Sequence, residues 1–191
     1  MSKYLFIIIL LLAAFFRFYG LNWDQNQHLH PDERFLTMVA IGMKWPTNLL
    51  QYFDTQASTL NPHNVGYGFY VYGTFPVILV KSIAEALKLG DYHNLTLVGR
   101  FISSLLDLGT TVLVFLISRR LFKSPSAALL TMFVYAISVL PIQLSHFFAV
   151  DTFLVFFLVL SFYLLITNNY LLLGIAFGLA IASKITAVLF A

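Results

Sequence analysis

The segment "QNQHLHPDERFLTMVA" at residues 25–40 gathers five side chains that could do chemistry. They are His28, His30, Asp32, Glu33 and Arg34. A carboxylate held in place can act as a general base, and histidine together with aspartate can bind a divalent metal. The two-residue spacing of the histidines does not put them on one face of a helix. This spacing does not favour a metal site, and a metal on His28 and His30 is kept only as an alternative.

The chain around this segment is strongly apolar. Of its 191 residues, 60% are hydrophobic and only 10% are charged. Soluble domains average about 25% charged residues, so the composition predicts an integral membrane protein. The net charge of +3 is too thinly spread to indicate binding of nucleic acid, and the absence of cysteine excludes disulfides and thiolate chemistry.

Five apolar runs predict an all-α, polytopic membrane protein. The runs cover residues 4–21, 98–120, 126–141, 150–167 and 170–191, and each approaches the roughly 20 residues that a helix needs to cross a bilayer. The first run is long for a signal peptide and is not followed by a cleavage site, so we expect a retained helix. Because the last run has no polar exit, we expect residues 1–191 to form one transmembrane module, truncated at its C-terminus.

The charges predict how these runs are oriented. Arg119, Arg120 and Lys123 form a basic cluster in a short loop, and such clusters lie in the cytoplasm. With the N-terminus also inside, the first run leads outward and one further crossing returns the chain to this cluster. Residues 22–95, between these two crossings, are then a long external loop with interfacial helices. A crossing by the glycine-interrupted residues 65–80 is the alternative.

A helix is predicted to start at Pro31, with Asp32 and Glu33 in its first turn. Its apolar residues Phe35, Met38, Val39 and Gly42 form a stripe, so the helix is predicted to lie on the outer leaflet. The chemically neutral interpretation is that the two acids only complement the helix dipole.

Five further landmarks follow one another along the chain: "HPDERFLTMVA", "YFDTQASTLNPHNVGYGFYVYGTFPVILV", "VGRFISSLLDLGTTVLVFLISRRLF", "IQLSHFFAVDTFLVFF" and "GLAIASKITA". In this order they resemble the polyprenyl-phosphate-sugar glycosyltransferases of the GT-C type. These membrane enzymes are related to protein O-mannosyltransferases and to the aminoarabinose transferases of lipid A. The resemblance implies a long first external loop with juxtamembrane helices and a catalytic Asp-Glu pair, Asp32 and Glu33, with Asp32 as the base.

The implied reaction moves a sugar from a polyprenyl phosphate to an acceptor hydroxyl of a protein, lipid or glycan outside the cytoplasm. A single base predicts inversion at the anomeric carbon. A phosphate leaving group needs nearby positive charge, for which Arg100 and Lys184 are the first candidates and Arg34 a further one. Asp151, by the resemblance, faces the external cavity and orients donor or acceptor, with His146 beside it.

Asp107 lies near the middle of a predicted span and must find a partner there. Counting helical rise from the ends of the two runs places Lys184 at a similar depth, which predicts an Asp107–Lys184 pair. The rival function is a transporter or flippase that uses these two residues as a relay. A non-catalytic scaffold is a second rival.

Overall fold

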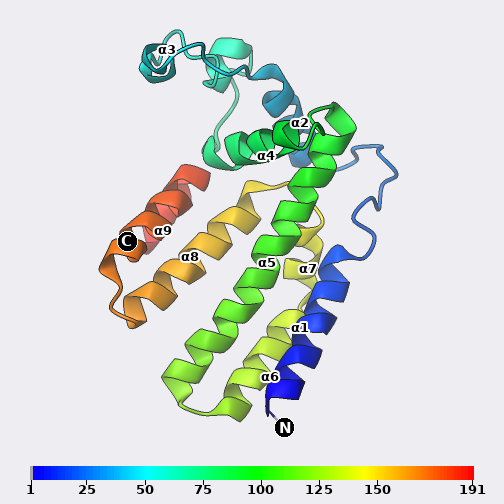
Figure 1. Cartoon of the computed structure of the whole chain (residues 1–191), viewed down its shortest axis with the longest axis vertical. Helices are drawn as coiled ribbons and strands as arrows, with labels where there is room; N and C mark the ends of the chain where they lie inside the picture. The colour runs from blue at the N-terminus through cyan, green and yellow to red at the C-terminus, as the bar shows by residue number, and fades with distance from the viewer. Residues whose placement is uncertain (1) are drawn as a thin grey trace.

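The computed structural model describes residues 2–191, and in this range all regular secondary structure is helical, with no strand (Figure 1). The elements, in chain order, are α1 (Ser2–Phe18), α2 (Pro31–Gly42), α3 (Leu49–Phe53), η1 (Pro62–Val65), α4 (Phe75–Ala86), α5 (Tyr92–Phe122), α6 (Pro125–Ala136), α7 (Val139–Ser145), α8 (Val150–Ile166), α9 (Tyr170–Ser183) and η2 (Ile185–Phe190). The all-α prediction is confirmed.

The long helix α5 organises a bundle and defines its two ends. It packs against α1, α6 and α8, and α8 packs against α9 (Figure 1). The N-terminus and the α5–α6 turn lie at one end, here named the basic end because it carries Arg119, Arg120 and Lys123. The opposite end carries α2 and α4, the start of α8 and the end of α9, and is named the carboxylate end after Asp32 and Asp151.

Among the described residues, α5 is the one helix long and apolar enough to cross a membrane by itself. The α6–α7 pair passes the same test as two pieces bent by 57°, and α8 and α9 are shorter apolar helices. The predicted single run at 126–141 is therefore broken. Pro141 cannot donate to the Ile137 carbonyl four residues earlier, and the Ser138 hydroxyl donates to the Val134 carbonyl instead.

The last apolar run is also not one helix. Residues 170–191 were predicted as a continuous span, but α9 ends at Ser183, and Lys184 is extended, with φ −157° and ψ 126°. The backbone N–H of Gly73, from the loop before α4, donates to the Ser183 carbonyl at 3.0 Å. This loop contact satisfies a terminal carbonyl that a continuing helix would have used.

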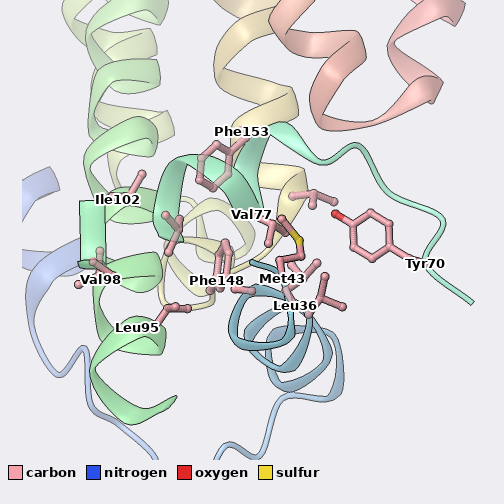
Figure 2. Close-up of a cluster of buried hydrophobic side chains, with 14 of the residues drawn as sticks. Leu36, Met43, Tyr70, Val77, Leu95, Val98, Ile102, Phe148 and Phe153 are labelled. Carbon is pink, nitrogen blue, oxygen red and sulfur yellow. The ribbon is translucent and has the colours of Figure 1, made fainter. Parts of the chain in front are cut away.

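A hydrophobic core joins the segment of α2 and α4 to the bundle. Leu36 and Val39 of α2, Val77 of α4 and Leu95 of α5 are buried together around Phe148 (Figure 2). Helix α2 therefore buries Leu36, Val39 and Ala40 against protein. Of the predicted stripe, Val39 lies against protein because α2 packs on α4 and α5, whereas Met38 is exposed. The position of this helix on the outer leaflet stays a prediction.

Candidate active site

The two acids of α2 point in different directions. Pro31 opens the helix, and Nδ1 of His30 accepts a hydrogen bond from the backbone N–H of Glu33 at 3.3 Å. Consecutive helical residues are turned by about 100°. As a result Glu33 is fully buried, whereas Asp32 is exposed. The pair is thus split into one acid inside the protein and one at its surface.

The inward acid binds Arg100, which is 1% exposed. Arg100 Nε donates to Glu33 Oε2 at 2.9 Å and Nη2 to Oε1 at 2.5 Å. Its Nη1 and Nη2 also donate to the two carboxylate oxygens of Asp24, at 3.0 and 2.8 Å, and Nη1 donates to the Leu21 carbonyl. These contacts use all five N–H donors of a guanidinium.

This cluster of Arg100, Glu33 and Asp24 ties four parts of the chain together. Asp24 lies in the loop after α1, Glu33 on α2 and Arg100 on α5, while the backbone N–H of Phe148 donates to Glu33 Oε2 at 2.7 Å. The Arg100 hydrogen bond holds the pKa of the Asp24 carboxyl down at about 2. Asp24 is therefore ionised at neutral pH, and the cluster is an anchor for the first turn of α2.

The predicted histidine candidates have partners of other kinds. His28 Nε2 and His93 Nδ1 lie 2.8 Å apart, and burial lowers the pKa of His28, helped by His93. His30 stacks on Phe147 and caps α2. His146 places its two ring nitrogens within 2.9 Å of the Ile142 and Tyr19 carbonyls. Within residues 2–191 no group of three or more metal-ligating side chains is present.

A second charged pair lies at the carboxylate end. Lys184 Nζ donates to Asp151 Oδ1 at 2.8 Å, and the two side chains are 29% and 42% exposed. Lys184 Nζ also lies 6.0 Å from the centre of the Tyr72 ring. Both charged groups keep access to solvent, so an incoming anion could reach the ammonium, in contrast to the closed Arg100 cluster.

Tyr72 connects this pair with Asp32. Burial raises the pKa of the Tyr72 hydroxyl, and the carboxylates of Asp32 and Asp151 raise this pKa further. The Lys184 ammonium acts in the opposite direction and lowers it. Asp32, Asp151 and Lys184 are thus all near enough to Tyr72 for their charges to act on its hydroxyl. Next to it lies a hollow of about 570 Å³ lined by Tyr52, Tyr72, Gly73, Thr74, Phe75, Ile78 and Ala182. Arg34 is exposed on α2, and its carbonyl accepts from Tyr92.

Gly73 is the reason that the Tyr72 loop can lie on α9. A Cβ at Gly73 would come 1.9 Å from the Ala182 carbonyl oxygen, which is far inside contact distance. Tyr70 donates to the Gly73 carbonyl at 2.7 Å and fixes the loop from the other side. Only glycine permits this approach of two backbones.

The predicted Asp107–Lys184 pair is wrong. Asp107 Oδ2 accepts from Arg17 Nε at 2.5 Å and Oδ1 from the Tyr135 hydroxyl at 2.6 Å. The depth estimate assumed a continuous final helix, but α9 ends before Lys184. The rule that a charge inside an apolar run needs a partner applies equally to Arg17, and would have found this pair. The relay proposed for a transporter loses its basis.

Sequence reasoning missed Asp24, Tyr72 and Gly73. Asp24 and Arg100 are 76 residues apart, and no local pattern links them. The run "YVYGTFP" around Tyr72 and Gly73 is typical of an interfacial belt, and only the position of α9 reveals its packing role.

The comparisons with known proteins give a family. Neither curated proteins nor solved structures give a match. The family model described as dolichyl-phosphate-mannose-protein mannosyltransferase matches residues 83–191, which is more than half of the chain. The match includes Arg100, Asp151 and Lys184, while Asp32 precedes it. Together with the helical architecture, it shows that this chain belongs to the dolichyl-phosphate-mannose-protein mannosyltransferase family of membrane-embedded glycosyltransferases.

Proposed function

We propose that the chain transfers a sugar from a polyprenyl-phosphate donor to an acceptor hydroxyl on the extracytoplasmic side of the membrane, with inversion and with Asp32 as the base. One observation carries the proposal: the Lys184–Asp151 pair lies against Tyr72 at the end of the bundle that carries Asp32, and the charges of all three residues act on the Tyr72 hydroxyl. A base and a cation are the two groups that this reaction requires.

The reaction follows from these groups. The acceptor oxygen forms a bond to the anomeric carbon while the bond from that carbon to the donor phosphate oxygen breaks. Asp32 takes the acceptor proton, and the phosphate leaves with the bonding electron pair. Lys184 stabilises the charge that develops on the phosphate. Because Asp151 is held by Lys184, we assign it to orienting the ammonium and not to nucleophilic attack, which favours inversion over retention.

Arg100 and Glu33 have a different place in this proposal. The Arg100 donors are used by carboxylates and a carbonyl, so we assign Arg100 and Glu33 to positioning α2 and the phosphate role to Lys184. Arg34, exposed two residues after Asp32 on α2, is a second candidate for the donor phosphate. His146 ties the end of α7 to the segment after α1 through its contacts with backbone carbonyls. All of these residues lie in one proposed transmembrane module, residues 1–191.

The test compares two exposed acids at the carboxylate end. Asp32→Asn removes the proposed base, whereas Asp91→Asn removes an acid that caps α5, a role that asparagine performs equally well. Membranes containing each variant are given radiolabelled dolichyl-phosphate mannose and a threonine-rich peptide. General bases contribute roughly 10²–10⁴-fold, so we expect Asp32→Asn to lose transfer by about that factor and Asp91→Asn to keep it.

Folding is monitored in the same preparations. We expect both variants to unfold thermally at the temperature of the wild type, because neither side chain belongs to the buried core. Transfer that survives Asp32→Asn within a few-fold would rule out Asp32 as the base. Donor-dependent export of mannose without transfer would instead favour the transporter alternative.

A further inference from the structure

A groove opens at the basic end, far from the candidate active site. It lies between α1, α5 and α6 and has a volume of about 360 Å³. Its lining consists of Lys3, Phe6, Ile7, Phe115, Arg119, Pro125 and Leu129. Arg119 is 19 residues along α5 from Arg100, or about 28 Å at the helical rise. The groove is therefore separated from the Arg100 cluster by close to the thickness of a bilayer's hydrocarbon core.

The groove combines two cations with apolar walls. Lys3 and Arg119 are exposed, and within residues 2–191 neither side chain makes an ion pair or hydrogen bond. The neighbouring Arg120 differs, because its Nε donates to the Ile166 carbonyl at 2.9 Å. The remaining lining residues are apolar, and no acid is among them. The two positive charges thus border an apolar groove that contains no counter-ion.

A second hollow adjoins this groove. It has a volume of about 380 Å³, shares Leu129 with the groove and is lined by Leu5, Ile8, Ile9, Leu12, Ser126, Leu129, Leu130 and Phe133. These side chains come from α1 and α6, and all but Ser126 are apolar. The groove and this second hollow therefore both offer apolar walls from α1 and α6 that suit hydrocarbon chains.

We propose that Lys3 and Arg119 bind the phosphate of an anionic diacyl phospholipid, and that one of its acyl chains lies in the groove between α1, α5 and α6. Arginine holds phosphate with two parallel hydrogen bonds, and lysine adds a point charge. An anionic headgroup is favoured over a zwitterionic one, because the latter brings a cation of its own next to Lys3. With the basic end in the cytoplasm, the lipid comes from the inner leaflet. This inference does not depend on the proposed transfer reaction.

The experiment counts lipids that stay bound. The full chain is reconstituted in bilayers of equal phosphatidylglycerol and phosphatidylcholine, released in mild detergent and weighed by native mass spectrometry. We expect phosphatidylglycerol to be retained by the wild type, at least about five-fold above phosphatidylcholine. The variant Lys3→Gln with Arg119→Gln should retain at least about five-fold less of it, since each lost contact to a charged group weakens binding.

A matched variant separates the groove from net charge. Lys44→Gln with Lys123→Asn also removes two exposed positive charges but none from the groove, so we expect retention within two-fold of the wild type. Ile7→Trp keeps both charges and fills the groove from its half-exposed side, so it should lower retention. Exposed positions leave the core unchanged, and thermal unfolding checks that each variant is folded.

Three results would overturn the proposal. One is equal loss of phosphatidylglycerol from the two charge variants, which would mean a general charge effect. Another is equal retention of phosphatidylglycerol and phosphatidylcholine by the wild type. The third is displacement of the lipid by millimolar glycerol phosphate, because a soluble phosphate without acyl chains should not compete with a ligand that also fills the groove.

Discussion

At the scale of single residues, the Asp32–Glu33 pair shows how one buried acid can position its neighbour. Glu33 accepts from Arg100 and from the backbone N–H of Phe148, so its carboxylate has little freedom to move. Asp32 lies in the same helical turn and is thereby held at the surface, where its charge acts on Tyr72. A base that is fixed in this way needs less reorganisation to reach a reacting hydroxyl.

The first residue-scale prediction compares the two sides of the Arg100 cluster. Arg100→Met leaves the fully buried carboxylates of Glu33 and Asp24 without a cation, which should destabilise the fold by about 3–5 kcal/mol. Glu33→Gln keeps the Arg100–Asp24 pair but turns an amide N–H₂ toward a donor, at a cost of about 1–3 kcal/mol. Thermal unfolding in detergent should rank Arg100→Met below Glu33→Gln. The opposite order would refute the anchoring role.

A second prediction at this scale concerns pH. Burial and His93 lower the pKa of His28, with Asp24 and Glu33 opposing and Arg100 adding to the effect. The unfolded chain therefore binds a proton that the folded chain resists, so His28 contributes stability above its ordinary pKa of 6.5 that is lost as the pH falls below it. Replacement by asparagine, which tolerates the positive φ of 51°, should reduce this loss.

The measurement is the unfolding midpoint at about pH 7.5 and about pH 5.5, on either side of the ordinary histidine pKa. We expect the midpoint of the wild type to fall more across this interval than that of His28→Asn. His63→Asn, a change at an exposed histidine of η1, serves as the control and should behave like the wild type. If His28→Asn and wild type show the same fall, His28 is not the group that titrates.

What the sequence reveals at this scale depends on how local the signal is. The helix start at Pro31 and the pair of acids behind it are written in consecutive residues, and the structure confirms the helix. The role of Arg100 depends on Asp24 and Glu33, which lie 76 and 67 residues away. Such a partner choice follows from tertiary packing, and a single sequence carries no direct record of it.

At the scale of elements, the loop before α4 and the end of α9 form one unit that positions Tyr72 against Lys184. Gly73 is its critical residue, because a Cβ there would collide with the Ala182 carbonyl. We predict that Gly73→Ala pushes the loop off α9 and lowers transfer from dolichyl-phosphate mannose at least about ten-fold. Side-chain misplacement by about 1 Å can cost on the order of 100-fold in rate.

The control for this prediction is Gly68→Ala in the same loop. A Cβ at Gly68 meets nothing within 4 Å, so activity should stay at the wild-type level. Both variants should keep the buried core of α2, α4 and α5, as judged by thermal unfolding. Equal activity of Gly73→Ala and Gly68→Ala would show that the contact with α9 does not position the site.

Elements also show which kinds of boundary a sequence predicts well. The starts of α8 and α9, at Val150 and Tyr170, agree with the predicted runs. The interruptions after Ala136 and Ser183 were missed, since apolar composition continues through both. Hydropathy measures how apolar a run is. Where a helix ends depends instead on proline, on side-chain hydrogen bonds and on contacts such as that of Gly73 with Ser183.

At the scale of the whole molecule, the two ends differ in chemistry. The carboxylate end gathers Asp32, Asp151 and Lys184, and the basic end carries the Lys3–Arg119 groove. Helix α5 connects the two over 31 residues. Helix α4 has 12 residues, or about 18 Å of rise, which is too short to cross roughly 30 Å of hydrocarbon. An external region at 22–95 stays the prediction, and a crossing by residues 65–80 its alternative.

The last prediction tests this arrangement by labelling single cysteines, since the chain has none of its own. Thr55 and Leu87 are exposed on either side of residues 65–80, and Ser126 is exposed at the basic end. In intact cells, a membrane-impermeant maleimide should label Thr55→Cys and Leu87→Cys but not Ser126→Cys. Permeabilisation should expose Ser126→Cys, which controls for reactivity. Labelling of only one of the first two would mean that residues 65–80 cross, and would separate Asp32 from Lys184 by the bilayer.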